Sequence, residues 1–144
     1  MAKLLQGTEL KTLLTAAGGR PADAWRWIET GQASVIAQSW QALPQAMARG
    51  DASALADWGP TQSLDALLKL CHDVSAVRAG AAPRFFDRQD LGGLAAAHGK
   101  AALYAMSSWS RELMAATRTV EHPFNPGLLL ESLASRAELA LNAR

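Results

Sequence analysis

The stretch Lys100-AALYAMSSWSRELMAATRT-Val120 decides the fold, because its apolar residues recur at helical spacing along its whole length. The intervals between them are 4, 3, 4, 3 and 4 positions, which places these residues on one face of an α-helix. They are Ala102, Met106, Trp109, Leu113, Ala116 and Val120. We therefore predict a long helix over 100–120 with a single core-facing seam.

The residues after this stretch predict a second helix from Pro126 to about Asn142. Asn125 stands where a helix N-cap is expected, and Pro126 suits the first helical position. The apolar residues cover more than one stripe, which predicts burial on two sides, either inside this domain or against a partner subunit. These residues are Leu128, Leu129, Leu130, Leu133, Ala137 and Leu141.

Further helices are predicted upstream of residue 100. A helix from Thr61 or Ser63 to about Ala79 carries one apolar stripe. A helical pattern over 33–49 contains Pro44, which predicts a kink or break there. Asp51 and Asp87 or Asp90 are candidate N-caps of two short helices, the first of them over 51–58. The stripe of the first-named helix consists of Leu64, Leu67, Leu68, Cys71, Val74 and Val77.

The N-terminal part predicts a short helix pair. The first helix spans 8–17 and stops at Gly18-Gly19; the second starts at Pro21 and ends near Gly31, with Trp25 and Ile28 on one face. A boundary near 31–34 divides the chain into 1–32 and 33–144.

Composition supports an all-α fold. Among 144 residues there are 30 Ala and 21 Leu but only six Val and Ile together, so strong helix formers dominate and a sheet protein is excluded. With 49% hydrophobic residues the chain can bury a real core. We predict a helical bundle of about five or six helices, preceded by the short pair.

Charge and cysteine content limit the possible environments. The formal net charge of +1 gives no broad basic field for non-specific DNA binding. Cys71 is the one cysteine, which fits a reducing compartment. No run approaches 18 apolar residues, and the first residues lack the apolar core of a signal peptide. We expect a cytoplasmic protein without membrane contact.

The pair His72-Asp73 is the strongest candidate for enzymatic chemistry, because helical metal-dependent phosphohydrolases of the HD type use such a dyad. That chemistry needs a further histidine upstream, and none precedes residue 72. We expect these two side chains to lie on the polar edge of their helix instead. His98 and His122 do not form a pair with metal-ligand spacing on one helical face. We predict no metal.

No other pattern indicates catalysis or a cofactor. Cys71 falls on an apolar stripe, as a small buried side chain does. The serines around Trp109 lack a nucleophile-elbow motif, and Gly18-Gly19 lacks the rest of a phosphate-binding loop. Of the five tryptophans, Trp25, Trp40 and Trp109 fall on predicted seams, whereas the positions of Trp27 and Trp58 stay undecided.

Three segments resemble the delta-prime subunit family of the bacterial DNA polymerase III clamp loader. The C-terminal segments WSREL (109–113) and EHPFNPGLLLESL (121–133) resemble the end of that subunit. LLKLCHD (67–73) resembles its preceding collar helix, and AAGGRPADAW (16–25) resembles the end of its lid domain. The resemblance covers most of the chain, and its final fifth is the most specific part.

The resemblance implies that 1–32 are the end of an ATPase lid and that 33–144 are a helical collar domain. Such a domain packs with the collar domains of the gamma/tau and delta subunits, and it meets the sliding clamp and DNA only indirectly. Ala22 stands at the sensor-2 arginine position, so no nucleotide contact or other cofactor is implied. We expect a non-catalytic assembly domain. The structural or interface residues that we expect are Trp109, Leu113, Asn125, Leu128, Leu129, Leu130 and Leu133.

Two alternatives stay open at this point. One is the phosphohydrolase built on His72-Asp73, which stoichiometric bound metal would indicate. The other is an independent nucleic-acid-binding helical domain, which salt-sensitive binding to primed DNA would indicate.

Overall fold

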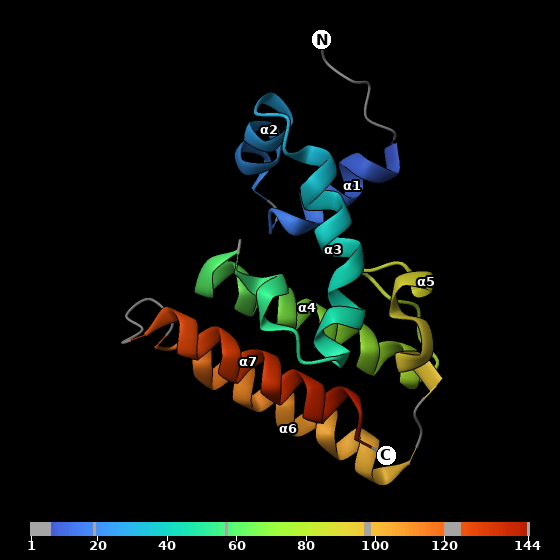
Figure 1. Ribbon diagram of the computed structural model, residues 1–144. Helices are drawn as coiled ribbons and strands as arrows, with labels where there is room; N and C mark the ends of the chain where they lie inside the picture. Colours follow the sequence, from blue (N-terminus) through green and yellow to red (C-terminus); the bar gives the residue numbers. More distant parts are fainter. Residues whose placement is uncertain (1–6, 19, 57, 97–98, 120–124, 144) are drawn as a thin grey trace. The chain divides into compact units, whose positions relative to one another are not determined.

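A computed structural model describes residues 7–18, 20–56, 58–96, 99–119 and 125–143 (Figure 1). Within these ranges the structure is helical and contains no strand, so the predicted all-α class is confirmed. The chain divides into two compact units, residues 1–42 and 43–144. The helices are α1 (Gly7–Ala16), α2 (Pro21–Glu29), α3 (Ala33–Ala48), η1 (Ala52–Leu55), α4 (Gly59–Arg78), α5 (Arg88–Leu91), η2 (Gly92–Ala96), α6 (Lys100–Thr117) and α7 (Pro126–Leu141), where η denotes a 3₁₀-helix.

The first unit contains the predicted helix pair, in which α1 packs against α2. Pro21 is at the start of α2, as predicted. The predicted face is wrong, however: Trp25 is 61% exposed, whereas Ala24 and Trp27 are buried. Residues three positions apart share a helical face, so Ala24 and Trp27 lie together on the buried side of α2. Trp25 follows Ala24 directly and therefore points in another direction, toward solvent.

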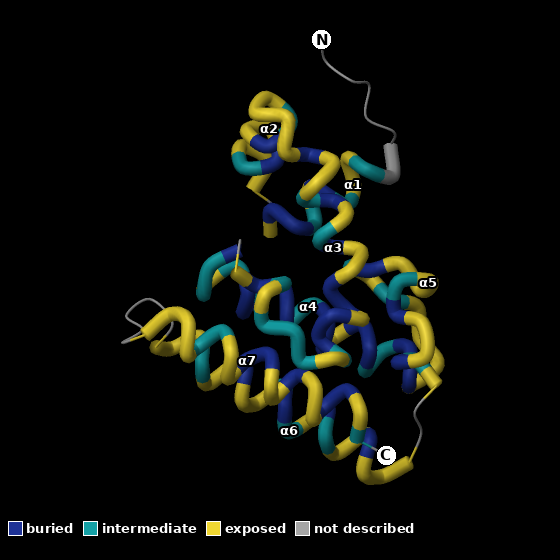
Figure 2. The backbone as a smooth tube through the Cα atoms, viewed as in Figure 1, coloured by how far each residue is buried: buried dark blue, intermediate teal, exposed yellow. Residues whose placement is uncertain are grey.

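The second unit is built around three long helices. α6 and α7 lie side by side and run in opposite directions, and α4 packs against both (Figure 1). The seam predicted for α6 is buried at Ala102, Met106, Trp109 and Leu113. Ala116 is half-buried, and Val120 lies outside the described residues. Exposed and buried bands alternate along α6 and α7, as expected for helices that bury one side (Figure 2).

The sequence predicts a kink or a break at Pro44, and α3 continues through this residue without a break. An interior proline costs a helix about 3 kcal/mol. Leu43, Pro44 and Met47 are all buried here. Burying an aliphatic side chain contributes about 1.5–3 kcal/mol, so these residues offset the cost.

Caps and one buried arginine fix the ends of several elements. The Asn125 side chain accepts a hydrogen bond from the Leu128 amide (3.1 Å), which confirms the predicted N-cap of α7. Asp51 caps η1 by accepting from the Ser53 amide (3.1 Å), although this helix is shorter than predicted. Arg78 is buried at the end of α4 and donates to the carbonyls of Leu94 (2.9 Å) and Leu141 (3.0 Å). It therefore ties the middle of η2 and the end of α7 to α4.

Across the described residues, no helix combines the length and the apolar character that a membrane span requires.

Candidate functional site

The His72-Asp73 pair lies near the middle of α4, and its geometry differs from the prediction. Asp73 is completely buried, so it does not lie on the polar edge of the helix. Its two carboxylate oxygens accept hydrogen bonds from the backbone amides of Arg84 (2.9 Å), Phe85 (2.7 Å) and Phe86 (2.7 Å). The His72 Nδ1 atom lies 2.9 Å from Asp73 Oδ1. A buried carboxylate is stable only when it is paired or hydrogen-bonded, and these partners meet that need.

The Asp73 carboxylate thereby holds the connection between α4 and α5 against the bundle. Three consecutive amides of this connection would otherwise lack helical or sheet partners, and a single anion satisfies all of them. Phe86 is buried next to this anchor. Asp73 is therefore a structural side chain whose lone pairs are already used.

A cationic and aromatic cluster surrounds the same point on the surface. The rings of His72 and Phe85 meet edge to face, with centroids 5.4 Å apart. The Lys69 ammonium and the Arg84 guanidinium lie 5.6 Å and 5.3 Å from the centre of the Phe85 ring. Lys69 also forms an ion pair with Asp65 (2.7 Å).

A groove of about 800 Å³ runs beside this cluster, and we call it the α4–α6 groove. Cys71 and Met106 are buried where α4 and α6 meet, and the Cys71 thiol lies 3.6 Å from the Met106 carbonyl oxygen. Burial raises the pKa of the Cys71 thiol to about 11. A thiol with so high a pKa is a poor nucleophile, which agrees with the predicted small buried side chain. The lining residues are Leu68, Cys71, His72, Ser75, Ala76, Leu103, Met106, Ser107, Ser110, Arg111 and Met114.

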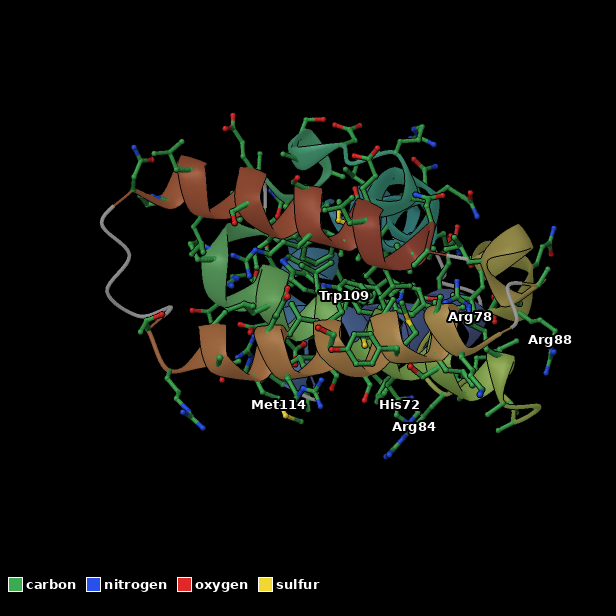
Figure 3. All side chains as sticks on the ribbon, turned by 90° about the horizontal axis from the view of Figure 1, so that it is seen from below. His72, Arg78, Arg84, Arg88, Trp109 and Met114 are labelled. Carbon is green, nitrogen blue, oxygen red and sulfur yellow. The ribbon has the colours of Figure 1, made fainter. Side chains whose placement is uncertain are left out.

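A smaller hollow of about 270 Å³ lies between α6 and α7, and we call the surface around it the α6–α7 surface. Tyr104 and Leu139 line it and are 69% and 73% exposed. Glu112 on α6 and Arg136 on α7 form an ion pair across it (3.3 Å). Trp109 lies beneath, between the helices (Figure 3), and its indole N–H has no hydrogen-bond acceptor among the described residues.

The structural and interface residues expected from the sequence fall into three groups. Trp109, Leu113 and Leu133 are buried in the core of the second unit. Asn125 is the cap of α7. Leu128 is 62% exposed, while Leu129 and Leu130 are half-buried.

Sequence reasoning missed the exposed apolar residues of α6, namely Leu103, Tyr104 and Met114. The sequence contained a signal for a second stripe. Positions 103, 107, 110 and 114 have the same 4, 3, 4 spacing as the buried seam and each follows a seam residue directly. Serines occupy the two middle positions, so this second stripe was not apparent from hydrophobicity alone. Trp27 and Trp58, undecided from the sequence, are buried.

Among the residues that the structure describes, no group of three or more His, Cys, Asp and Glu side chains is placed to hold a metal ion. His98 and His122 lie outside the described residues, as do 121–124 of the motif over 121–133. A phosphohydrolase would need Asp73 as a metal ligand, but its oxygens already accept backbone hydrogen bonds. The geometry therefore does not favour that alternative, and the absence of a metal stays a prediction.

Comparison with known protein families, curated proteins and solved structures finds no match to this chain.

Proposed function

We propose that this chain is a non-catalytic helical assembly domain of the clamp-loader delta-prime type. In this proposal, 1–32 are the end of an ATPase lid and 33–144 are the collar domain. This collar domain packs against the collar domains of the gamma/tau and delta subunits. It does not contact the sliding clamp or DNA directly. The proposal starts from the sequence resemblance of 109–113, 121–133, 67–73 and 16–25.

The observation that carries the proposal is the exposure of large apolar side chains on α6 and α7. Tyr104, Leu128 and Leu139 are each more than 60% exposed. Covering a large apolar side chain contributes about 1.5–3 kcal/mol before the entropic cost of association. A helical subunit packed on the α6–α7 surface would supply that cover.

The chemistry of the remaining groups supports an assembly role over an enzymatic one. Asp73 holds backbone amides, the Cys71 thiol has a raised pKa, and the Glu112–Arg136 pair bridges two helices on the surface. Each of these groups has a structural explanation. None of them forms, with its neighbours, a nucleophile and base pair.

Co-purification with the gamma/tau and delta subunits of the source organism tests the proposal. The full chain should elute with them as one complex in gel filtration. Leu139→Lys and Tyr104→Lys should weaken this association at least ten-fold. Leu103→Lys is the matched control, because it changes an exposed apolar residue on the other side of α6 and should leave assembly unchanged.

Three results would overturn the proposal. The first is the absence of a complex with the unaltered chain. The second is stoichiometric bound metal in the purified protein, which would favour the phosphohydrolase. The third is salt-sensitive binding of the isolated chain to primed DNA, which would favour a nucleic-acid-binding domain.

A further inference from the structure

The α4–α6 groove has the shape of a docking site for a helix. The middle of its α6 wall carries the small residues Ser107 and Ser110, whereas Cys71 and His72 are at the middle of its α4 wall. Longer side chains stand toward the ends of the α6 wall, where Leu103 is 53% exposed and Met114 is 58% exposed. Small residues in the middle let another backbone approach closely, and the flanking apolar side chains can then cover it.

The groove also has the length of a few helical turns. Leu103 and Met114 are eleven positions apart on α6, so they are separated by about 16 Å along the helix axis. A partner helix of three turns spans this length and presents apolar anchors at i, i+4, i+7 and i+11. Methionine adapts to varied partners because its side chain is unbranched and flexible, which suits Met114 at the rim.

One cationic side chain, Arg111, is in the described lining of the groove. Arg111 lines it, is exposed and forms no ion pair within the described part of the chain. His72 lines the opposite wall, and His72, Arg84 and Met114 lie along the same side of the unit in Figure 3. Among the residues that the structure describes, no carboxylate lines the groove. The acidic residues near the groove have partners within the chain. Asp73 is buried and accepts hydrogen bonds from backbone amides. Asp65 forms an ion pair with Lys69, and Glu112 forms one with Arg136.

We infer that the α4–α6 groove binds an amphipathic helix of a partner protein whose apolar stripe is flanked by acidic side chains. The apolar stripe packs between Leu103, Met106 and Met114, and the acidic side chains face Arg111. This inference does not rest on the proposed assembly role, because the lining of the groove shares no residue with the lining of the α6–α7 hollow.

Two other occupants fit the observations less well. A small-molecule site encloses most of its ligand, whereas the exposure of Leu103 and Met114 shows that this groove is open along its length. A second copy of this chain could present α7, but its two acidic residues Glu131 and Glu138 share that helix with Arg136, which pairs with Glu112 of its own chain. The test therefore includes dimer formation as an outcome. A separate acidic helix matches both the shape and the charge.

The test uses the full chain and two fluorescein-labelled 18-residue helical peptides as probes. Both carry leucines at i, i+4, i+7 and i+11 and alanines elsewhere, except that one has glutamates beside the leucine stripe and the other has lysines. Fluorescence anisotropy should show saturable one-to-one binding of the glutamate peptide. The lysine peptide should bind at least ten-fold more weakly in low salt.

Surface variants then locate the binding site. Met114→Lys and Leu103→Lys should weaken binding of the glutamate peptide at least ten-fold. Arg111→Glu should reverse the preference, so that the lysine peptide binds more tightly. Val35→Lys is the matched control, because Val35 is an equally exposed apolar residue that lines neither the groove nor the α6–α7 hollow, and this variant should bind as the unaltered chain does. Circular dichroism verifies that each variant keeps its helices, as expected for exposed positions.

Five outcomes would overturn the inference, and four of them come from the peptide assay. These four are no saturable binding of the glutamate peptide, equal affinity for both peptides, no change on Arg111→Glu, or equal loss with Val35→Lys. A dimer in analytical ultracentrifugation that Met114→Lys dissociates would also overturn it, because a second copy would then occupy the groove. Loss of assembly with Leu139→Lys and retention of peptide binding would separate this site from the α6–α7 surface.

Discussion

The substitution Asp73→Asn should destabilise the fold by about 2–4 kcal/mol. Each carboxylate oxygen has two partners, since Oδ1 faces the Arg84 amide and His72 while Oδ2 faces the amides of Phe85 and Phe86. An asparagine keeps one acceptor oxygen and places an NH₂ group against the remaining donors. A hydrogen bond to a charged group contributes about 1.5–3 kcal/mol, and a buried donor without a partner costs about 1–3 kcal/mol.

Urea unfolding followed by circular dichroism measures this loss. The midpoint should fall while the slope of the free energy against urea stays unchanged, because the surface exposed on unfolding is the same. The backbone amides of 84–86 should also exchange with deuterium faster in the variant, while those of α6 follow only the global change. A loss of this size is a large part of the usual 5–15 kcal/mol stability of a domain.

Asp65→Asn is the matched control on the same helix. Asp65 is half-exposed and pairs with Lys69, and such surface pairs contribute about 0.2–1 kcal/mol. The control should therefore unfold close to the unaltered chain. A change below about 0.5 kcal/mol for Asp73→Asn, or equal losses in both variants, would refute the assignment of Asp73 as the anchor of the 84–86 connection.

Three further measurements address local features of the second unit. Asn125→Ala should lower the free energy of unfolding by about 1 kcal/mol through loss of the α7 cap, and an unchanged melting temperature would contradict the cap. Gly50→Ala should cost about 1–2 kcal/mol, because Gly50 has a φ of +69° and an added Cβ would meet the Glu138 carboxylate. Adding Glu138→Ala to this variant should restore only the stability lost to the clash with the carboxylate. Complete restoration would contradict a cost of the positive φ at position 50. Because the pKa of the Cys71 thiol rises from 9.0 to about 11, iodoacetamide at pH 8 should alkylate it about 100-fold more slowly than the same thiol in urea-unfolded chain, and equal rates would argue against burial.

The helices of the second unit could be predicted from sequence because their signals are local. The apolar spacing in α4 and α6 and the Asn125-Pro126 start of α7 depend on residues within one or two turns. The same rules were insufficient for Pro44. The free-energy cost of a proline inside a helix is local, but the burial that offsets it depends on residues distant in sequence. They also failed for α2, where a short helix offers more than one apolar face.

The candidate sites required the tertiary structure. The partners of Asp73 lie 11 to 13 positions downstream, beyond the reach of any helical spacing rule. Leu103 and Met114 look like ordinary helix residues until the packing of α4 leaves them uncovered. Sequence by itself determined where the helices of this chain form, because helix formation is governed by neighbours within about four residues. Only the tertiary structure decided which side chains are buried, satisfied or left exposed, because those outcomes depend on elements that are distant in sequence and meet on folding.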